Sequence, residues 1–235
     1  MNIAVCIKQV PDTTEVKLDP KTGTLIREGI PSIMNPDDKA ALEAALTIKD
    51  KLGAEVHVIT MGPMQADAVL REALAMGADK AYLLTDRAFG GADTLATSTT
   101  LAAALSKIDF DLILAGRQAI DGDTAQVGPQ IAEHLGIPNV SCAEDIEVNG
   151  KEITIKRWYE DRFHTVKVKM PCLITVLGEM NTPRYMTPGG IFDAYDTEVT
   201  DWKREDVTVD DTKIGLKGSP ICVAASLPKS LKAAG

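Results

Sequence analysis

The sequence is poor in the residues that build metal centres and disulfide frameworks, and it has no segment suited to cross a membrane. It contains only four cysteines and three histidines among 235 residues, and no two cysteines form a CxxC pair. We therefore expect reduced thiols and no metal site. No apolar run approaches the roughly 20 residues that span a bilayer. The amino terminus shows no charged leader with a cleavage site, so we expect a cytoplasmic protein.

Composition also limits the ligands and the core. The net charge is −9, and no cluster of Lys and Arg is long enough to follow a phosphate backbone, which argues against nucleic-acid binding. With 45% hydrophobic residues, the chain can bury one ample core, as a single large domain or a domain with an extension. Aromatic residues make up only 4%, so we expect a core of Ala, Val, Ile and Leu.

Short apolar runs alternate with amphipathic segments over the first 138 residues. Such alternation predicts an α/β fold with a doubly wound parallel sheet. The predicted strands cover residues 3–10, 56–61, 80–85 and 112–115. The predicted helices cover residues 36–52, 65–76, 94–105 and 127–135. The first helix has Asn35 as its cap, Pro36 at its first position and Gly53 at its end, and its predicted buried residues are Leu42, Ala45, Leu46, Ile48 and Leu52.

The pattern changes after Pro138. Asn149-Gly150 lies between two alternating runs and predicts a β-hairpin. Residues 163–170 also alternate, and we expect the apolar run 172–177 to return to the main sheet. A surface hairpin is expected over residues 16–27. From Gly178 the chain turns acidic, and we interpret residues 179–235 as an extended arm after an α/β domain of residues 1–178.

The polar loop between the fourth strand and the fourth helix is the strongest candidate site. Pro129 lacks an amide hydrogen and belongs in the first helical turn. The free amides at Gln126, Val127 and Gly128 then face the carboxyl edge of the sheet, where open α/β sheets bind ligands and helix starts hold phosphate. Arg117 can add positive charge to such a site.

Other observations leave this interpretation open. Asp121 and Asp123 would repel phosphate unless they point away or bind other groups. The loop has neither GxxxxGK[ST] nor GxGxxG, and most loops of this kind bind nothing. Residues 90–94 (GGADT) are similar to the SGGxDS loop of ATP pyrophosphatases, but Asp93 is more simply the cap of the next helix. Asp121-Gly122-Asp123 lacks the later ligands of a calcium loop.

A resemblance to a known protein family favours nucleotide binding over a loop that binds nothing. The stretch GRQAIDGDTAQVGPQIAEHLGIP, from Gly116, resembles the adenine-nucleotide loop of the electron-transfer flavoprotein β subunit. MNIAVCIKQVPD, IMNPDDKAALEAAL, ITMGP followed by LREALAMGAD, and NTPRY occur in the same order as in that family. The resemblance covers roughly the first four-fifths of the chain. It implies an adenine-nucleotide-binding fold of the kind shared with universal-stress proteins and ATP pyrophosphatases.

The resemblance also implies a cofactor pocket and no catalytic side chain, because the cofactor carries out the chemistry. The pocket is predicted in the domain of residues 1–178, at the ends of three strands and one helix start. Its predicted residues are Cys6, Asn35, Pro36, Asp37, Asp38, Met61, Gly116, Arg117, Gln118, Ala119, Ile120, Asp121, Gly122, Asp123, Thr124, Ala125, Gln126 and Val127. From the residues alone, Cys6 and Met61 are ordinary core positions and Asn35 to Asp38 a helix cap.

Partners follow from the same resemblance. The chain is expected to form a heterodimer with an α subunit that carries the main flavin. The segment that begins at Asn181 and ends at Asp196 matches the part that recognises an acyl-CoA or related flavin dehydrogenase. In respiratory members a Leu-Pro and a lysine-rich run follow NTPRY, whereas this chain has Pro188-Gly189-Gly190 and acidic residues, which puts the usual acyl-CoA dehydrogenase partners in doubt. The family usually continues beyond residue 235.

Two subtypes of the family differ in the ligand of this pocket. In the bifurcating type, which the loop sequence favours, the pocket holds FAD that accepts hydride from NADH. Electrons then pass to ferredoxin or flavodoxin and, through the α-subunit FAD, to the dehydrogenase. In the conventional type the pocket holds structural AMP. A universal-stress-like nucleotide-binding signalling module, or an ATP pyrophosphatase using residues 90–94, are alternatives outside the family.

Overall fold

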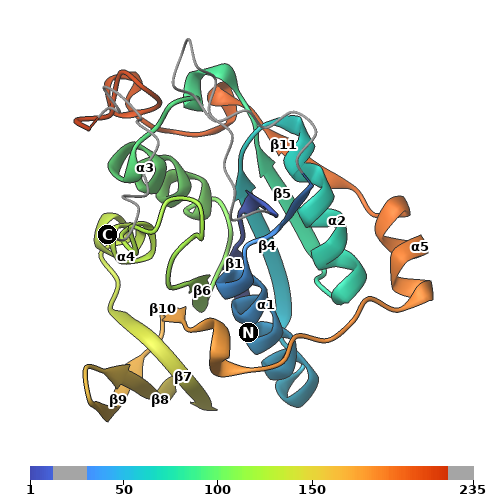
Figure 1. The fold of residues 1–235 in the computed structure, drawn as a ribbon, viewed down its shortest axis with the longest axis vertical. Helices are drawn as coiled ribbons and strands as arrows, with labels where there is room; N and C mark the ends of the chain where they lie inside the picture. The colour runs from blue at the N-terminus through green and yellow to red at the C-terminus, as the bar shows by residue number, and fades with distance from the viewer. Residues whose placement is uncertain (13–30, 222–235) are drawn as a thin grey trace, which may run out of the picture.

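A computed structural model describes residues 1–12 and 31–221. Within these ranges one sheet has the order β11-β5-β4-β1-β6-β10-β7-β8-β9, and β2 and β3 form a separate pair (Figure 1). The strands are β1 Asn2–Cys6, β2 Gln9–Pro11, β3 Ser32–Met34, β4 Glu55–Met61, β5 Lys80–Leu84, β6 Leu112–Gly116, β7 Asn139–Asn149, β8 Glu152–Tyr159, β9 Arg162–Lys169, β10 Cys172–Val176 and β11 Val199–Trp202. The helices are α1 Pro36–Leu52, α2 Asp67–Met76, α3 Thr94–Leu105, α4 Val127–Leu135 and α5 Pro188–Asp196.

The sheet is doubly wound, as predicted. Neighbouring strands from β11 to β7 are parallel, whereas the β7–β8 and β8–β9 pairs at one end of the sheet are antiparallel. Alternate residues of β1 enter two cores, because successive side chains of a strand point to opposite faces. Ile3 and Val5 belong to the core that contains α1 and α2, whereas Ala4 and Cys6 belong to the core of α3 and α4.

The order of the strands determines where a ligand can bind. From β1 the chain moves outward through β4 to β5, and β6 then lies on the opposite side of β1. The strand order therefore reverses between β1 and β6. At such a switch point the loops leave the carboxyl ends of adjacent strands in opposite directions, and a crevice opens between them.

The helices agree closely with the sequence predictions. Helix α3 has the predicted bounds, and the Asp93 carboxylate accepts the Ala96 amide at 2.9 Å as an N-cap. Gly53 and Gly136 end α1 and α4 in the left-handed conformation, with φ of 68° and 64°. One predicted core residue of α1 is wrong: Leu52, the last residue of the helix, is 56% exposed.

The predicted first strand is also wrong in its length. β1 ends at Cys6, and residues 9–11 pair instead with β3 in the small sheet. The break occurs because the Lys8 amide donates to the Asp38 carboxylate at 2.9 Å rather than to a neighbouring strand. The predicted hairpin of β7 and β8 and the return of β10 to the main sheet are confirmed. The hairpin expected over residues 16–27 lies outside the described residues.

The described part of the carboxyl arm has more regular structure than its composition indicates. It forms α5, and β11 then pairs in parallel with β5 at the edge of the main sheet. The rings of Tyr82 and Trp202 stack with centroids 4.6 Å apart across this pair. A four-residue strand gives a weak pattern in sequence, so its pairing was not predicted. The domain boundary at Gly178 stays a prediction.

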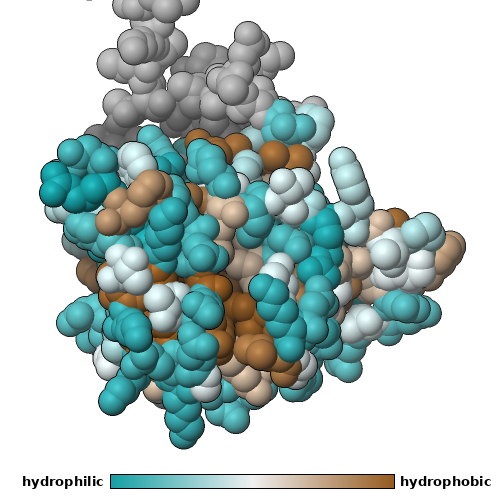
Figure 2. All heavy atoms as spheres, turned by 90° about the horizontal axis from the view of Figure 1, so that it is seen from below, coloured by the Kyte–Doolittle hydropathy of each residue, from teal (hydrophilic) through white to brown (hydrophobic). Residues whose placement is uncertain are grey.

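None of the helices in the described ranges has the length and apolar character needed to cross a membrane. Viewed from below, where α1 ends and β4 begins, the surface has an apolar centre surrounded by polar side chains (Figure 2). A groove on this side of α1 is lined by residues of α1 and β7, including Ile48, Leu52, Ile146 and Val148.

Two leucines of α1 test the burial described above. Leu46 is 1% exposed and Leu52 is 56% exposed. We expect Leu46→Ala to lower the free energy of unfolding by about 3 kcal/mol, because it removes buried methyl groups and leaves a cavity. Leu52→Ala should change it by less than about 0.5 kcal/mol. Urea unfolding of both variants measures the difference, and equal losses would contradict the assigned burial.

Candidate functional site

The candidate site begins where the ends of β1 and β6 meet the start of α1. Asp38, in the first turn of α1, is only 7% exposed. One carboxylate oxygen accepts the Gly116 amide at 3.0 Å, and the other accepts the Lys8 amide at 2.9 Å. A single side chain therefore joins the carboxyl ends of the two strands that flank the switch point.

Burial changes the acid–base properties of this corner. It raises the pKa of Asp38 to about 7, although hydrogen bonds from Asn35, Gly116 and Lys8 act in the opposite direction. Burial also raises the pKa of Asp37, which the Arg117 guanidinium opposes. The Cys6 thiol has its pKa raised to about 12, first by burial and then by Asp38. Cys6 packs in the core of α3 and α4, and its raised pKa disfavours the thiolate form.

Asn35 holds the polar loop rather than the helix. Its side chain is fully buried; Nδ2 donates to the Gln118 carbonyl at 2.8 Å, and Oδ1 accepts the Ile120 amide at 3.1 Å. Asn35 is the N-cap residue of α1, as predicted, but its side chain forms no capping bond to the helix. An asparagine suits this position because its side-chain amide has both a donor and an acceptor, and the loop offers one backbone carbonyl and one backbone amide.

The acidic residues of the loop are paired with other side chains. The Lys8 ammonium lies 2.6 Å from the Asp121 carboxylate, and the Gln118 amide donates to Asp123. Their repulsion of an anion is reduced accordingly. Asp123 and Ala125 have φ of 51° and 52°, a conformation that costs residues with a side chain about 1–3 kcal/mol. Such backbone strain is typical of loops that are shaped for a ligand.

The start of α4 is packed tightly against the sheet. A Cβ added to Gly128 would lie 2.6 Å from the Thr175 methyl group, so only glycine allows this approach. Pro129 is the third residue of the helix, as predicted. The Thr94 hydroxyl donates to the Gln126 side chain at 2.8 Å, which brings the start of α3 beside the loop. The first amides of α4 have no carbonyl partner within the helix.

Polar groups of the site retain binding capacity. Asp37 Oδ2 and Arg117 Nε are buried atoms without a hydrogen-bond partner among the described residues, and they lie 3.7 Å apart. The Arg117 guanidinium forms an ion pair with Asp37 in the first turn of α1, and its Nε keeps a donor that suits an anion such as a phosphate. In the described ranges, no group of three or more His, Cys, Asp or Glu side chains is arranged to hold a metal ion.

The structure brings most of the predicted residues to one edge. Residues 35–38 and 116–118 are in direct contact through Asn35 and Asp38, whereas residues 120–126 are exposed at the rim. Cys6 and Met61 lie at strand ends but pack into the core of α3 and α4. Lys8 was not predicted. Its position directly after the first strand could have placed Lys8 at the site, but the predicted strand ran to residue 10 and included Lys8.

Doubly wound α/β proteins with polar loops gathered at a switch point form a broad class that binds nucleotides and related cofactors. The family model described as "Electron transfer flavoprotein domain" matches residues 22–207. The chain is 60% identical over its full length to the electron transfer flavoprotein subunit beta of Clostridium acetobutylicum, of which it covers 91%. The chain therefore belongs to the electron transfer flavoprotein β-subunit family.

Two further relatives are named as parts of reductase complexes. The chain is 58% identical to the caffeyl-CoA reductase-Etf complex subunit CarD of Acetobacterium woodii, with 100% of the chain and 90% of that protein covered. It is 46% identical to the acryloyl-CoA reductase electron transfer subunit gamma of Anaerotignum propionicum, with 100% and 91% covered. The family resemblance found in the sequence is confirmed.

Gly116, which ends β6, and Gly122, in the loop that follows, test the close approach of β6 to α1. A Cβ at Gly116 would lie 2.4 Å from Asp38 Oδ1 and 2.7 Å from the Asp37 carbonyl carbon, whereas a Cβ at Gly122 meets nothing within 4 Å. We expect Gly116→Ala to lower the free energy of unfolding by about 3 kcal/mol, since backbone must move. Gly122→Ala should change it by less than about 1 kcal/mol. Chemical unfolding measures both, and a well-tolerated Gly116→Ala would count against the described packing.

Asp38 predicts a pH-dependent stability. Its pKa rises from an ordinary 3.8 to about 7 on folding. Between these values the folded chain keeps the proton that the unfolded chain has lost, so this group makes stability fall as pH rises from about 4 to about 7 and has no further effect above that range. In Asp38→Asn the slope of unfolding free energy against pH should be less negative over that window. Urea unfolding at several pH values tests this, and parallel curves would contradict it.

Proposed function

We propose that this chain holds FAD at the β1–β6 switch point, as the β subunit of a cytoplasmic heterodimer. The heterodimer takes hydride from NADH and bifurcates the electrons. One electron goes to ferredoxin or flavodoxin, and the other passes through the α-subunit FAD to a partner dehydrogenase. The observation that carries this proposal is the Asn35 side chain, which is buried and bonded on both sides to the loop at Gln118 and Ile120. Such an anchor keeps a strained polar loop in place at the edge where cofactors bind.

The side chains of the chain supply binding and electrostatics. A bound FAD supplies the redox chemistry, which is uptake of an electron pair from a hydride donor and release of single electrons. Arg117 and the first amides of α4 would hold the phosphates, because they combine a positive charge with unpaired donors. Burial raises the pKa of Asp38 to about 7, which lowers the negative charge that this residue adds beside Asp37. Lys8 would partly offset the charge of Asp121 at the rim.

Two considerations favour FAD over AMP. The likeness to relatives named as subunits of caffeyl-CoA and acryloyl-CoA reductase complexes supports the anaerobic, bifurcating type. The loop version at residues 122–125, the FGGADTLATS stretch after β5 and the absence of a lysine-rich run after NTPRY support it as well. In the second candidate function, a conventional β subunit, the same edge holds AMP as a structural ligand.

The proposed docking segment for the dehydrogenase runs from Asn181 to Asp196. It contains the most exposed aromatic residue in the described ranges, Tyr185, which is 95% exposed. Phe192 and Tyr195 on α5 are each 75% exposed. Exposed aromatic side chains of this kind are typical of interface anchors. Aromatic residues flanked by Asp193 and Asp196 suit a partner surface that is apolar with a basic rim.

The ligand of the site is the first quantity to measure. The heterodimer should be purified with its α subunit and denatured, and the released nucleotides counted by chromatography. We expect two FAD and no AMP per heterodimer. One FAD and one AMP would establish the conventional type instead, and the absence of both from a folded heterodimer would exclude the site.

A pair of asparagine variants tests whether the counted nucleotide depends on the site at Asn35. Asn35→Ala leaves the Gln118 carbonyl and the Ile120 amide without their partner, so it should reduce nucleotide content at least about twofold. Asn139→Ala is the control, because Asn139 donates to the Leu173 carbonyl near the opposite end of the strands. Its nucleotide content should equal that of the wild type.

A further inference from the structure

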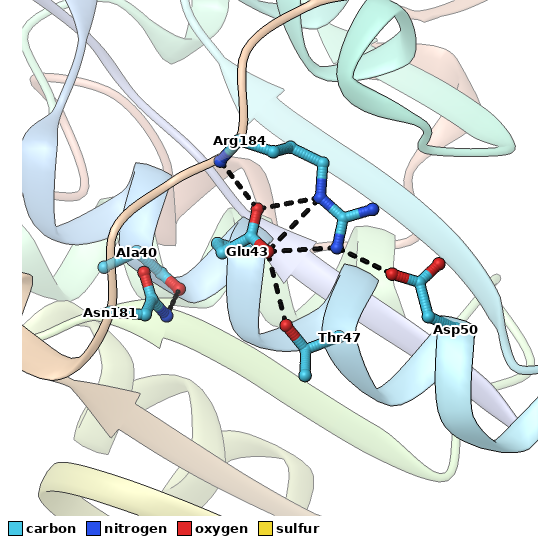
Figure 3. A network of polar contacts seen from close by, with 6 residues as sticks. All are labelled: Ala40, Glu43, Thr47, Asp50, Asn181 and Arg184. Atoms are coloured by element: carbon cyan, nitrogen blue, oxygen red, sulfur yellow. Dashed lines mark hydrogen bonds and ion pairs between the residues drawn. The ribbon is translucent and has the colours of Figure 1, made fainter.

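The segment between η3 (Gly178–Met180) and α5 is bound along one face of α1 (Figure 3). The side-chain amide of Asn181 donates to the backbone carbonyl of Ala40 at 2.9 Å. The Arg184 guanidinium donates to both oxygens of Glu43, at distances from 2.9 to 3.2 Å, and to Asp50 at 2.8 Å. The partners at positions 40, 43 and 50 are three and seven residues apart and therefore lie on one side of the helix.

Glu43 fixes the main chain of the segment as well as its side chain. The Arg184 amide donates to Glu43 Oε2 at 2.9 Å. Glu43 is only 8% exposed, and its other partner is the Thr47 hydroxyl at 3.3 Å. A buried carboxylate that binds both a backbone amide and a guanidinium restrains the position of residue 184 and the direction of its side chain. A surface ion pair would not impose both restraints.

A second anchor lies on α2. Arg71 donates to the carbonyls of Ala194 and Thr197 at 2.6 and 2.5 Å. A Cβ at Gly190 would lie 2.5 Å from the Ala75 carbonyl oxygen, so α5 contacts α2 closely. In Figure 1 the chain crosses from β10 past α1 and reaches α5 beside α2. The docking segment is thus held at both ends, with Tyr185 next to the first anchor.

We propose that Arg184 is a positioning residue for partner docking: through Glu43 and Asp50 it holds Tyr185 and the start of α5 in the orientation that a dehydrogenase binds. This inference rests on the proposed docking function. A segment that is ordered before binding loses less conformational freedom in the complex, so affinity rises without a new contact. Arg184 itself is two-thirds buried against α1 and acts through the residues that it places.

Kinetics can separate positioning from stability. Electron transfer between the heterodimer and a purified acryloyl-CoA reductase, the activity named for one relative's complex, should be measured for the wild type, Arg184→Met and Arg184→Met/Glu43→Met. Arg184→Met leaves a buried carboxylate unpaired and should lose stability. It should also raise the KM for the reductase about tenfold with kcat unchanged, whereas Arg184→Lys should give a smaller rise.

The double variant decides between the two roles. It removes the buried charge along with its partner, so stability should return in part, because the Arg184 amide and the Thr47 hydroxyl still lose their acceptor, while the KM stays raised. Recovery of the KM together with stability would overturn the proposal, as would a fall in kcat at unchanged KM. Lys51→Met, which removes one positive charge from the exposed end of the same helix, is the control and should leave the KM unchanged.

Hydrogen–deuterium exchange tests the clamp without a partner. Amides of residues 182–192 should exchange at least about tenfold faster in Arg184→Met than in the wild type, and at the wild-type rate in Lys51→Met. Unchanged exchange in Arg184→Met would overturn the inference. If wild-type transfer to the reductase did not saturate, the proposed docking function would fail, and the exchange rates would still decide whether Arg184 orders the segment.

Discussion

The architecture of the candidate site depends on one buried carboxylate. Asp38 accepts amides from Lys8 and Gly116, which follow β1 and end β6. The strand order reverses between these two strands, so their carboxyl ends would otherwise diverge. The bond to Lys8 also ends β1 and directs the chain into the small sheet, and the bond to Gly116 requires a residue without a Cβ. Burying this group is unfavourable for its charged form, which is why its pKa lies near neutrality.

Through Asn35 and Glu43, α1 holds both the polar loop of the candidate site and the proposed docking segment. Asn35 gives up the side-chain cap that such a residue usually provides, worth about 1 kcal/mol, and bonds to the polar loop instead. Glu43, two turns further along, binds Arg184 of the docking segment. Both side chains connect α1 to a segment that is distant in the sequence.

The sequence predicted most of the fold because local signals were strong. Asp93, Gly53 and Gly136 mark helix ends, and Asn149-Gly150 marks a hairpin by chemistry that acts within a few residues. The family resemblance pointed to the polar loop after β6 as the candidate site, and in the structure Asn35 bonds to this loop while Asp38 bonds to Gly116 directly before it. What failed depends on distant partners: the pairing of Lys8 with α1, the exposure of Leu52 and the pairing of β11 with β5. No window of neighbouring residues contains those contacts.

The strand order also affects how the molecule behaves in a concentrated solution. An unpaired sheet edge can recruit another chain and start aggregation, unless it is short or carries charge. Here one edge strand is β9, with exposed Arg162, Lys167 and Lys169, and the other is β11, with four residues and an exposed Asp201. The apolar strands β1 and β6 lie in the middle of the sheet, far from either edge. Placing β11 beside β5 thus covers the longer apolar edge that β5 would otherwise present to solvent.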